Sequence, residues 1–370
     1  MKRGSGEGTY RKRPDGRWEA RLYIQGKQRS FYAKTLRECQ QKFNAAQRAA
    51  EQGLPIADER LTVAKFLDDW LESAQSSLRP STLRSYQDIV RLHIKPELGK
   101  VKLAKLSPRQ VQNLLNKKLK TGLSRRRCEY IYAVLHRALG QAVRWGIISR
   151  NVAGLISPPR PKKKTAKFLT LEQARKLLQA AEGDRLEALY SVAMSAGLRR
   201  GEIVALQWQD IDLAGGTLRV RHTLQRIDGK LTLVEPKSAA GLRTIVLADM
   251  TIQALRAHRK RQLEEKMLTG PQWQDTGFVF TSTIGTPLDG DNVYTRYQAL
   301  LKKAGLPATP FHSLRHTACS FLAAQGVHPT TARDFMGHSQ ISLTMDVYSH
   351  AALEAKKEAA VKIDELFKGL

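Results

Sequence analysis

The segment MGHSQISLTMDVYSH, residues 336–350, places a tyrosine among histidines near the end of the sequence. Tyr348 follows His338 by ten residues and precedes His350 by two. A phenol has an ordinary pKa of about 10, so its oxygen attacks phosphorus only where neighbouring groups take its proton or stabilise the phenolate. For a lone tyrosine, packing in a core is the more common role. The chemistry of Tyr348 therefore depends on which groups the fold brings to it.

Two earlier motifs offer cationic side chains. In SAGLRRGEIVALQW, Arg199 precedes an expected helix, whose free N–H groups also attract an anion. A structural pair between Arg199 and Glu202 is at least as good an interpretation. In EPKSAAGLRTIVL, Lys237 lies at an expected hairpin tip beside small residues, exposed enough to reach a ligand. Most such lysines contact only water, so neither motif identifies a site by itself.

A third motif, FHSLRHTACSFLAAQG, combines an arginine with two histidines. His312, Arg315 and His316 have the spacing i, i+3 and i+4, so they share one face of an expected helix. Arg315 beside His312 suits a planar, bidentate grip on a phosphate together with a proton donor or acceptor. The histidine pair also raises a zinc alternative. The metalloprotease pattern, however, needs a glutamate where this chain has Ser313, so we expect no metal.

The charge balance indicates a polyanionic partner. The 370 residues include 62 Lys and Arg against 34 Asp and Glu, a formal net charge of +28, which favours nucleic acid. The three cysteines are widely spaced without a CxxC pair, which argues against a disulfide framework or a cysteine-built zinc site. We find no apolar run of membrane-spanning length and no signal peptide. We therefore expect a cytoplasmic protein associated with the bacterial nucleoid.

The first 56 residues predict a small basic domain. Apolar and polar residues alternate around residues 18–24, which indicates two or three short strands, and Thr35 with Glu38 forms a capping box for a following helix. Residues 1–48 carry 13 Lys and Arg against 4 Asp and Glu. A basic sheet of this kind can lie in a major groove, although a merely solvated basic face is the alternative. The candidate DNA contacts are Arg11, Lys12, Arg13 and Arg21.

Residues 61–156 predict a purely helical domain, followed by a basic Pro/Lys linker at 157–167. Arg125 and Arg126 begin the last helix, where the helix dipole disfavours positive charge, so an external anion such as a DNA backbone explains them as well as solvation does. The linker contains no acidic residue and suits a strap across DNA. Its candidate contacts are Lys162, Lys163 and Lys164.

Residues 168–350 predict a mixed α+β, mainly helical domain. The segment TLRVRHTLQRIDGKLTLVE is typical of a hairpin that turns at Asp228 and Gly229, LRTIVL predicts a further strand, and helices are expected from Asp249 onward. The tail, residues 351–370, has apolar residues near one helical face. It can fold back on its own domain or dock on a neighbouring protomer.

The order and spacing of these motifs resemble the tyrosine recombinases, the phage integrase family. The resemblance covers essentially the whole chain: residues 1–56 resemble an arm-type DNA-binding domain, 61–156 a core-binding domain and 168–350 the catalytic domain. It implies that Tyr348 is the nucleophile, that Arg199 and Arg315 hold non-bridging oxygens, and that Lys237 protonates the leaving 5′ oxygen. It also implies that His312 is an acid/base partner and that His338 completes the phosphate pocket.

The resemblance implies a DNA integrase that works as a homotetramer on synapsed core-type and arm-type sites, through a Holliday junction. The tail would dock in a neighbouring protomer, and DNA-bending or directionality proteins would assist. We expect no cofactor, because the sequence has no phosphate-binding loop and religation from a covalent link needs no ATP. Two alternatives stay open: a type IB topoisomerase with the same tyrosine chemistry, and a DNA-binding regulator that no longer cuts.

Overall fold

The computed structural model describes most of the chain. The described residues are 9–24, 27–51, 60–161, 168–227, 229–236, 239–337, 340–342, 344–345, 347–348 and 360. The chain divides into two compact units, residues 1–163 and 164–370, and each is described by itself. The division falls in the segment predicted as a linker, whose residues 162–167 lie outside the described ranges. In the part of the chain that the structure describes, no helix combines the length and apolar character that a membrane crossing needs.

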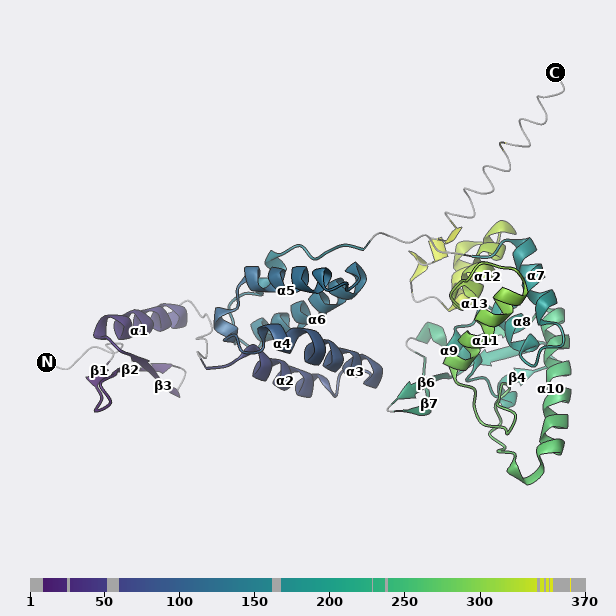
Figure 1. The fold of residues 1–370 in the computed structure, drawn as a ribbon, viewed down its shortest axis with the longest axis horizontal. Coiled ribbons are helices and arrows are strands. Elements are labelled where there is room, and N and C mark those ends of the chain that lie inside the picture. Colours follow the sequence, from purple (N-terminus) through teal and green to yellow (C-terminus); the bar gives the residue numbers. More distant parts are fainter. Residues whose placement is uncertain are drawn as a thin grey trace, which may run out of the picture. The chain divides into compact units, whose positions relative to one another are not determined.

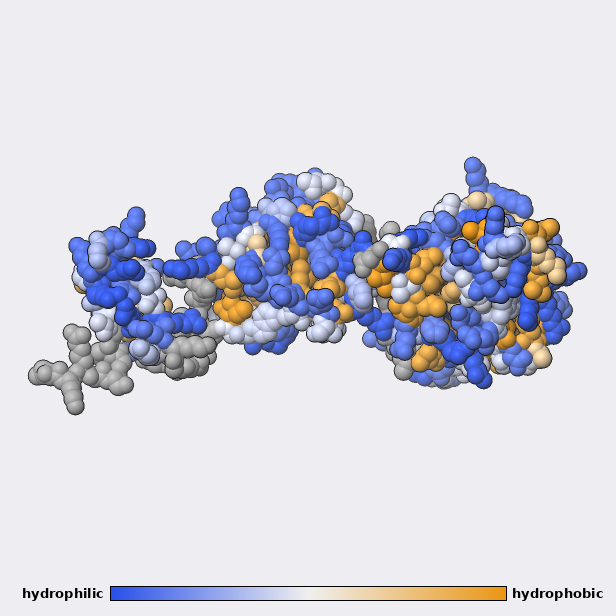
Figure 2. Space-filling view, turned by 90° about the horizontal axis from the view of Figure 1, so that it is seen from below, coloured by the Kyte–Doolittle hydropathy of each residue, from blue (hydrophilic) through white to orange (hydrophobic). Residues whose placement is uncertain are grey.

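The first unit begins with a three-stranded antiparallel sheet and one helix, as predicted (Figure 1). Strands β1 (Thr9–Lys12), β2 (Trp18–Ile24) and β3 (Lys27–Ala33) pair in sequence order, and α1 (Leu36–Glu51) covers one face. The apolar positions of β2 form a small core with Cys39 and Phe43 of α1. We call residues 9–51 the N-terminal module. In Figure 2 its visible surface, at the left, is mainly hydrophilic.

The rest of the first unit is helical. Its elements are α2 (Val63–Ala74), α3 (Pro80–Ile89), a π-helical turn (Val90–Ile94), α4 (Lys95–Leu98), α5 (Pro108–Lys120) and α6 (Arg125–Arg144). One apolar core, which includes Phe66, Leu115 and Leu135, joins them. Helix α5 begins at a capping box of Ser107 with Gln110, and Ser124 caps α6. Local capping chemistry therefore sets these helix starts, as the sequence predicted for α5.

The second unit is mainly helical with two small sheets. Its helices are α7 (Leu171–Ala181), α8 (Glu187–Ser195), α9 (Arg200–Ile203), α10 (Asp249–Thr269), α11 (Gly290–Lys303), α12 (Ser313–Ala324) and α13 (Pro329–Met336). Strands β4 (Ile211–Asp212), β5 (Thr217–Val220) and β8 (Arg243–Val246) form one sheet. Helix α8 is buried along most of its length and packs against α10 and α12. This buried helix ends just before the motif that contains Arg199.

The predicted hairpin is present but shorter than expected. Strands β6 (Thr223–Ile227) and β7 (Lys230–Val234) pair around Gly229, whose φ of 81° is a conformation that glycine adopts readily. Residues 217–220, which we predicted as part of this hairpin, instead form β5 and pair with β4 and β8. The chain passes from one sheet to the other between β5 and β6, and no local sequence pattern predicts that change. The tail at 351–370 lies outside the described residues except for Ala360.

Candidate active site

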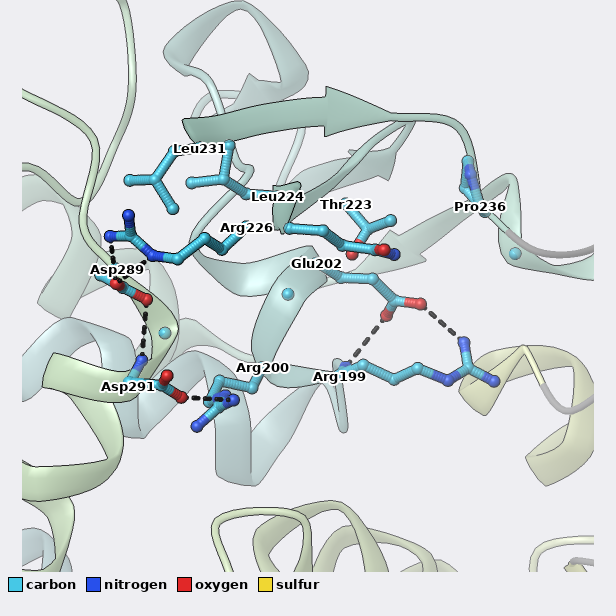
Figure 3. Close-up of a pocket in the computed structure, with 14 residues that line it drawn as sticks. Arg199, Arg200, Glu202, Thr223, Leu224, Arg226, Leu231, Pro236, Asp289 and Asp291 are labelled. Carbon is cyan, nitrogen blue, oxygen red and sulfur yellow. Dashed lines mark hydrogen bonds and ion pairs between the residues drawn. The ribbon is translucent and has the colours of Figure 1, made fainter. Parts of the chain in front are cut away.

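Arg199 caps the short helix α9 and joins three parts of the second unit. Its Nη1 donates to Glu202 Oε1 at 2.6 Å and its backbone N–H donates to Oε2 at 3.0 Å (Figure 3). Its Nη2 donates to the carbonyl oxygen of Gly337 at 3.0 Å. The side chain is still 40% exposed. The structural pair with Glu202 is therefore real, and it leaves part of the guanidinium facing solvent.

Glu202 also binds a second arginine that the sequence did not single out. Arg243, at the start of β8, donates from Nη2 to Glu202 Oε2 at 3.1 Å and from Nε to the carbonyl oxygen of Phe335 at 3.1 Å. Burial would raise the pKa of Glu202, but the Arg243 charge and the hydrogen bonds from Arg199 and Arg243 outweigh it, so the pKa is lowered. Glu202 is thus an ionised, buried anchor for two cations.

Arg315 is a buried cation beneath this turn. The residue is 1% exposed, and its Nη1 donates to the carbonyl oxygen of Gly197 at 2.7 Å. Burial and the charge of Arg199 lower the pKa of Arg315 to about 9, still well above neutrality. The hydrogen bond to Gly197 ties α12 to the turn that contains Arg199. Arg199 and Arg315, 116 positions apart in the sequence, therefore belong to one electrostatic cluster.

His312 joins the same cluster from the N-terminus of α12. We predicted it inside the helix, but it is the N-cap residue, one position before the helix begins. The i, i+4 neighbour relation still holds, because the rings of His312 and His316 lie 4.8 Å apart. The surrounding protein and the charges of His316, Arg315 and Arg199 lower the pKa of His312 to about 4. The residue nevertheless has an exposed surface. In this state it is a neutral imidazole at neutral pH.

The hydroxyl of Tyr348 is held by a backbone group. The hydroxyl donates to the carbonyl oxygen of Val327 at 2.8 Å, and the ring packs on a small cluster with Cys319 and Met336. Burial and the neighbouring Cys319 raise the pKa of Tyr348. A raised pKa favours the neutral phenol, so activation of this oxygen needs a change in its surroundings.

A cavity of about 570 Å³ lies beside Arg199. Figure 3 shows its walls: α9, the β6–β7 hairpin and the start of α11. Two ion pairs cross it, Arg226 to Asp289 at 2.6 Å and Arg200 to Asp291 at 3.1 Å. These pairs fasten the hairpin and α9 to the N-terminus of α11. The hairpin that precedes Lys237 is thus tied to the helix turn that follows Arg199.

The chemistry of the cluster suits a phosphodiester. Arg199 and Arg243 bind the carboxylate of Glu202, and Arg315 lies near enough for the charges of all three to affect its pKa, so the cluster has three cations and one anion. Guanidinium groups form paired hydrogen bonds with phosphate oxygens and stabilise charge that develops on them. Across the described ranges, no three His, Cys, Asp or Glu side chains gather in a way that would hold a metal ion.

The predicted site residues have different outcomes. Arg199, His312 and Arg315 come together, while Lys237 and His338 lie outside the described residues. No described contact joins the hydroxyl of Tyr348 to either arginine. Two residues were missed, Arg243 and Gly337. Gly337 lies in the segment MGHSQISLTMDVYSH, but sequence reasoning assigned it no role, and nothing local marks Arg243, because its partners are far away along the chain.

The predicted DNA contacts differ in position. Arg11 and Arg21 bind the same carboxylate, that of Glu19, and Arg13 lies over the ring of Tyr32. Lys12 pairs with Trp18, whose side chain packs on the core side of the sheet, so Lys12 projects toward the opposite face from Arg11. Arg125 and Arg126 are exposed in the first turn of α6, and Arg126 also pairs with Glu129 at 3.1 Å. Lys162, Lys163 and Lys164 lie outside the described residues.

The fold is similar to solved structures of integrases. The integrase of the Tn1549 transposon, solved with transposon right-end DNA, superposes with a TM-score of 0.70 at 21% identity, covering 82% of this chain and 100% of that one. A lambda integrase tetramer bound to a Holliday junction gives a TM-score of 0.59 at 20% identity, covering 91% and 94%. At such identities the likeness concerns the fold, and it confirms the predicted multidomain, mainly helical architecture.

The sequence comparisons identify the family as well as the fold. Residues 167–354 match the phage integrase family, and residues 62–119 match the N-terminal SAM-like domain of phage integrases. A XerC-like tyrosine recombinase of Caldanaerobacter subterraneus subsp. tengcongensis is 30% identical over 359 residues, which cover 92% of each chain. By these matches the chain belongs to the phage integrase family of tyrosine recombinases.

Proposed function

We propose that this protein is the site-specific recombinase of a phage or other mobile element, and that Tyr348 is its nucleophile. The observation that carries the proposal is a cationic cluster at the motif positions of the family, in which Arg199 binds a buried carboxylate and Arg315 is tied to the turn before Arg199. Phosphoryl transfer asks a protein mainly for positioning and for stabilisation of charge on oxygen. This cluster supplies both.

The proposed step is a transesterification. The hydroxyl oxygen of Tyr348 forms a bond to the scissile phosphorus, and the bond from phosphorus to the 5′ oxygen breaks. Arg199 and Arg315 hold the non-bridging oxygens, His312 takes the phenol proton, and His338 completes the pocket. Lys237 donates a proton to the leaving 5′ oxygen. The products are a 3′-phosphotyrosyl link and a free 5′-hydroxyl, and attack by the 5′-hydroxyl of another strand reverses the step.

The hydrogen bond from Tyr348 to Val327 gives this mechanism a requirement. The phenol must release its hydrogen bond to the Val327 carbonyl before His312 can take the proton, because one proton cannot be donated to both acceptors. Losing one neutral hydrogen bond costs about 1 kcal/mol, so DNA binding can drive the change. In this proposal the bond biases the phenol toward the Val327 carbonyl until a phosphate enters the cluster.

We propose separate DNA roles for the domains. Residues 61–156 and 168–350 would clamp a core-type site, and residues 1–56 would bind arm-type sites. Four protomers would synapse two core sites through a Holliday junction, with the tail at 351–370 docked in a neighbour. Linking two DNA-binding parts raises the local concentration of the second site. DNA-bending or directionality proteins would assist, and the enzyme would act on the nucleoid in the bacterial cytoplasm.

A nicked duplex that traps the covalent intermediate tests the assignment of Tyr348. Wild-type protein incubated with a nicked duplex of the element's core site should form a covalent complex that survives denaturation, and Tyr348→Phe should form none. Native binding of the same duplex should persist in the variant, because the change removes only a hydroxyl. A covalent complex with Tyr348→Phe would show that another residue is the nucleophile.

The same experiment, together with a plasmid relaxation assay, separates the alternatives. A regulator that no longer cuts would give no covalent complex with the wild-type protein. A type IB topoisomerase would relax supercoiled plasmids that lack any attachment site, and a site-specific recombinase would not. The relatives found by comparison are named recombinase and integrase, and they give no support to either alternative.

A further inference from the structure

The open face of the N-terminal sheet has a carboxylate at its centre. Glu19 of β2 lies directly opposite Arg11 of β1 and Tyr32 of β3. Directly paired residues project to the same face of a sheet, and the alternate positions Ala20 and Leu22 pack on α1. Glu19 therefore lies on the face that α1 does not cover. A carboxylate in such a place is normally hydrated, yet the Glu19 side chain is only 3% exposed.

Two arginines cover this carboxylate. Arg11 Nε donates to Glu19 Oε2 at 2.5 Å, and Arg21 Nε donates to Oε1 at 3.0 Å. The hydroxyl of Tyr32 lies 3.4 Å from Oε1. The hydrogen bonds from Arg21 and Arg11 lower the pKa of Glu19 to about 2. The covering atoms are thus charged neighbours rather than apolar core, and Glu19 holds both guanidinium groups as an anion.

Because each arginine is held through Nε, the edge of its guanidinium with the two terminal nitrogens is available to another partner. Both use Nε toward Glu19, and no described residue accepts a hydrogen bond from the terminal nitrogens of Arg11 or Arg21. Their side chains are 55% and 38% exposed. Two terminal nitrogens of an arginine match O6 and N7 of guanine in the major groove. An arginine fixed before binding also loses less side-chain entropy when it binds.

The surrounding charges favour DNA on this face. Arg13 and Arg17 lie over the ring of Tyr32, at 5.4 and 5.9 Å from its centroid. Asp15 pairs with Arg17 at 2.6 Å. Because this one carboxylate faces two arginines, Arg13 and Arg17, the turn keeps a net positive charge. Such flanking cations suit backbone phosphates, which position a protein without reading sequence. The central arginine pair is then the part of the face suited to read bases.

We propose that Glu19 is a positioning residue that sets the base specificity of the N-terminal module, by aiming Arg11 and Arg21 at guanines in two neighbouring base pairs of an arm-type site. The proposal rests on the proposed arm-binding function of residues 1–56. Glu19 contacts no base in this arrangement. Its negative charge weakens binding to DNA in general, and the order it imposes on the two arginines favours the right sequence.

The first step of the test finds the arm motif. Full-length protein and a variant lacking residues 1–52 each select binders from a pool of duplexes with a randomised central segment. The motif recovered by the full chain alone is the arm motif, and the proposal expects guanines at two neighbouring base pairs within it. If the deletion removes no motif, the arm-binding function itself fails, and the specificity proposal fails with it.

The second step measures discrimination in full-length Glu19→Gln. The probes are a duplex that carries the arm motif, copies with each of its G·C pairs changed to A·T, and a duplex without the motif. A glutamine has an amide nitrogen, which only donates, in place of one carboxylate oxygen, so it cannot accept from both Nε groups in the present geometry. We expect the preference for guanine at one or both positions to fall roughly tenfold. Affinity for the duplex without the motif should stay equal or rise, because a negative charge has been removed.

Matched variants decide between positioning and simple folding. Glu38→Gln makes the same charge change at an exposed position of α1 and should leave guanine preference unchanged. Arg21→Lys keeps the charge but not the planar pair of donors, so it should lose preference while keeping affinity for the duplex without the motif. If Glu19→Gln keeps its guanine preference, the proposal is wrong. If Glu19→Gln loses all binding, like the deletion, Arg21→Lys decides: retained preference overturns the proposal and selective loss supports it.

Discussion

At the scale of single residues, Glu202 is the group on which the proposed catalytic cluster depends. It accepts hydrogen bonds from Arg199 and Arg243 and is itself almost fully buried. Glu202→Gln keeps the shape but leaves two guanidinium groups without their anion, so we expect the second unit to lose about 3 kcal/mol of stability near pH 7. Cleavage of a nicked duplex should fall as well, because Arg199 loses its orientation. Hydrogen exchange of peptides from α8 and β8 measures the stability.

The pH dependence gives this prediction its sign. Because the pKa of Glu202 is lowered in the folded protein, its contribution is complete above the ordinary value of about 4.5 and is lost as the pH falls through the folded pKa. The difference between wild type and Glu202→Gln should therefore shrink on acidification below that value. Glu264→Gln, at an exposed position of α10, is the matched control and should change little. A difference that stays constant or grows with acid contradicts the assigned charge state.

Sequence reasoning named Arg199, His312 and Arg315 of the cluster, but it missed Arg243 and did not show how these side chains are held. The spacing of Arg199 and Glu202 indicated a pair, since side chains three apart meet at the start of a helix. The link from Glu202 to Arg243 spans 41 positions, and that from Arg315 to Gly197 spans 118. Such links arise from the packing of α12 and β8, which periodicity does not specify. The N-cap position of His312 was misjudged by one residue, because the helix boundary depends on backbone geometry.

At the scale of elements, the end of α13 supports the active site through its backbone. Gly337 ends the helix in the left-handed region with a φ of 66°, and its carbonyl oxygen accepts a hydrogen bond from Arg199. An added Cβ would lie 2.7 Å from the carbonyl oxygen of Ala240 and 2.8 Å from a terminal nitrogen of Arg243. The position therefore requires glycine for its conformation and for its close neighbours.

Gly305 provides a matched comparison, because it has the same φ of 66° and no atom within 4 Å of an added Cβ. We expect Gly305→Ala to cost about 1 kcal/mol of stability, from backbone strain alone, and to leave cleavage unchanged. Gly337→Ala adds overpacking, so it should cost about 2 to 4 kcal/mol and slow cleavage of a nicked duplex. Denaturant unfolding and single-turnover cleavage measure the two effects. Equal costs at both positions would mean that the neighbours of Gly337 yield easily.

Elements with strong local signals were predicted well. The N-terminal strands, the caps of α1 and α5, and the β6–β7 hairpin follow from alternation, capping boxes and turn glycines. The sheet of β4, β5 and β8 was not predicted, because β5 pairs with a strand more than twenty residues later in the sequence. Leu218 and Ile245 are paired in this sheet, and both are buried in the core. Only the folded core brings them together.

At the scale of the whole molecule, charge is distributed over parts with different tasks. The net charge of +28 is spread over the chain, and residues 1–48 alone carry 13 Lys and Arg against 4 Asp and Glu. In the N-terminal module Arg11 and Arg21 are exposed on the open sheet face, while Arg243 is buried beside Glu202. Salt screens the interactions of exposed cations strongly and those of buried cations much less. The two kinds of site should therefore respond differently to ionic strength.

Salt dependence tests this division in the full chain. The logarithm of the binding constant falls with the logarithm of salt concentration by about 0.9 for each phosphate neutralised on B-DNA. Deleting residues 1–52 should flatten the slope by several units on a duplex that carries the arm motif. Cleavage of an isolated core site should remain, because the catalytic cluster is untouched. Fluorescence anisotropy over a salt series measures the slopes. Parallel slopes, or equal loss of arm binding and core cleavage, would mean that the N-terminal residues are not a separate DNA-binding part.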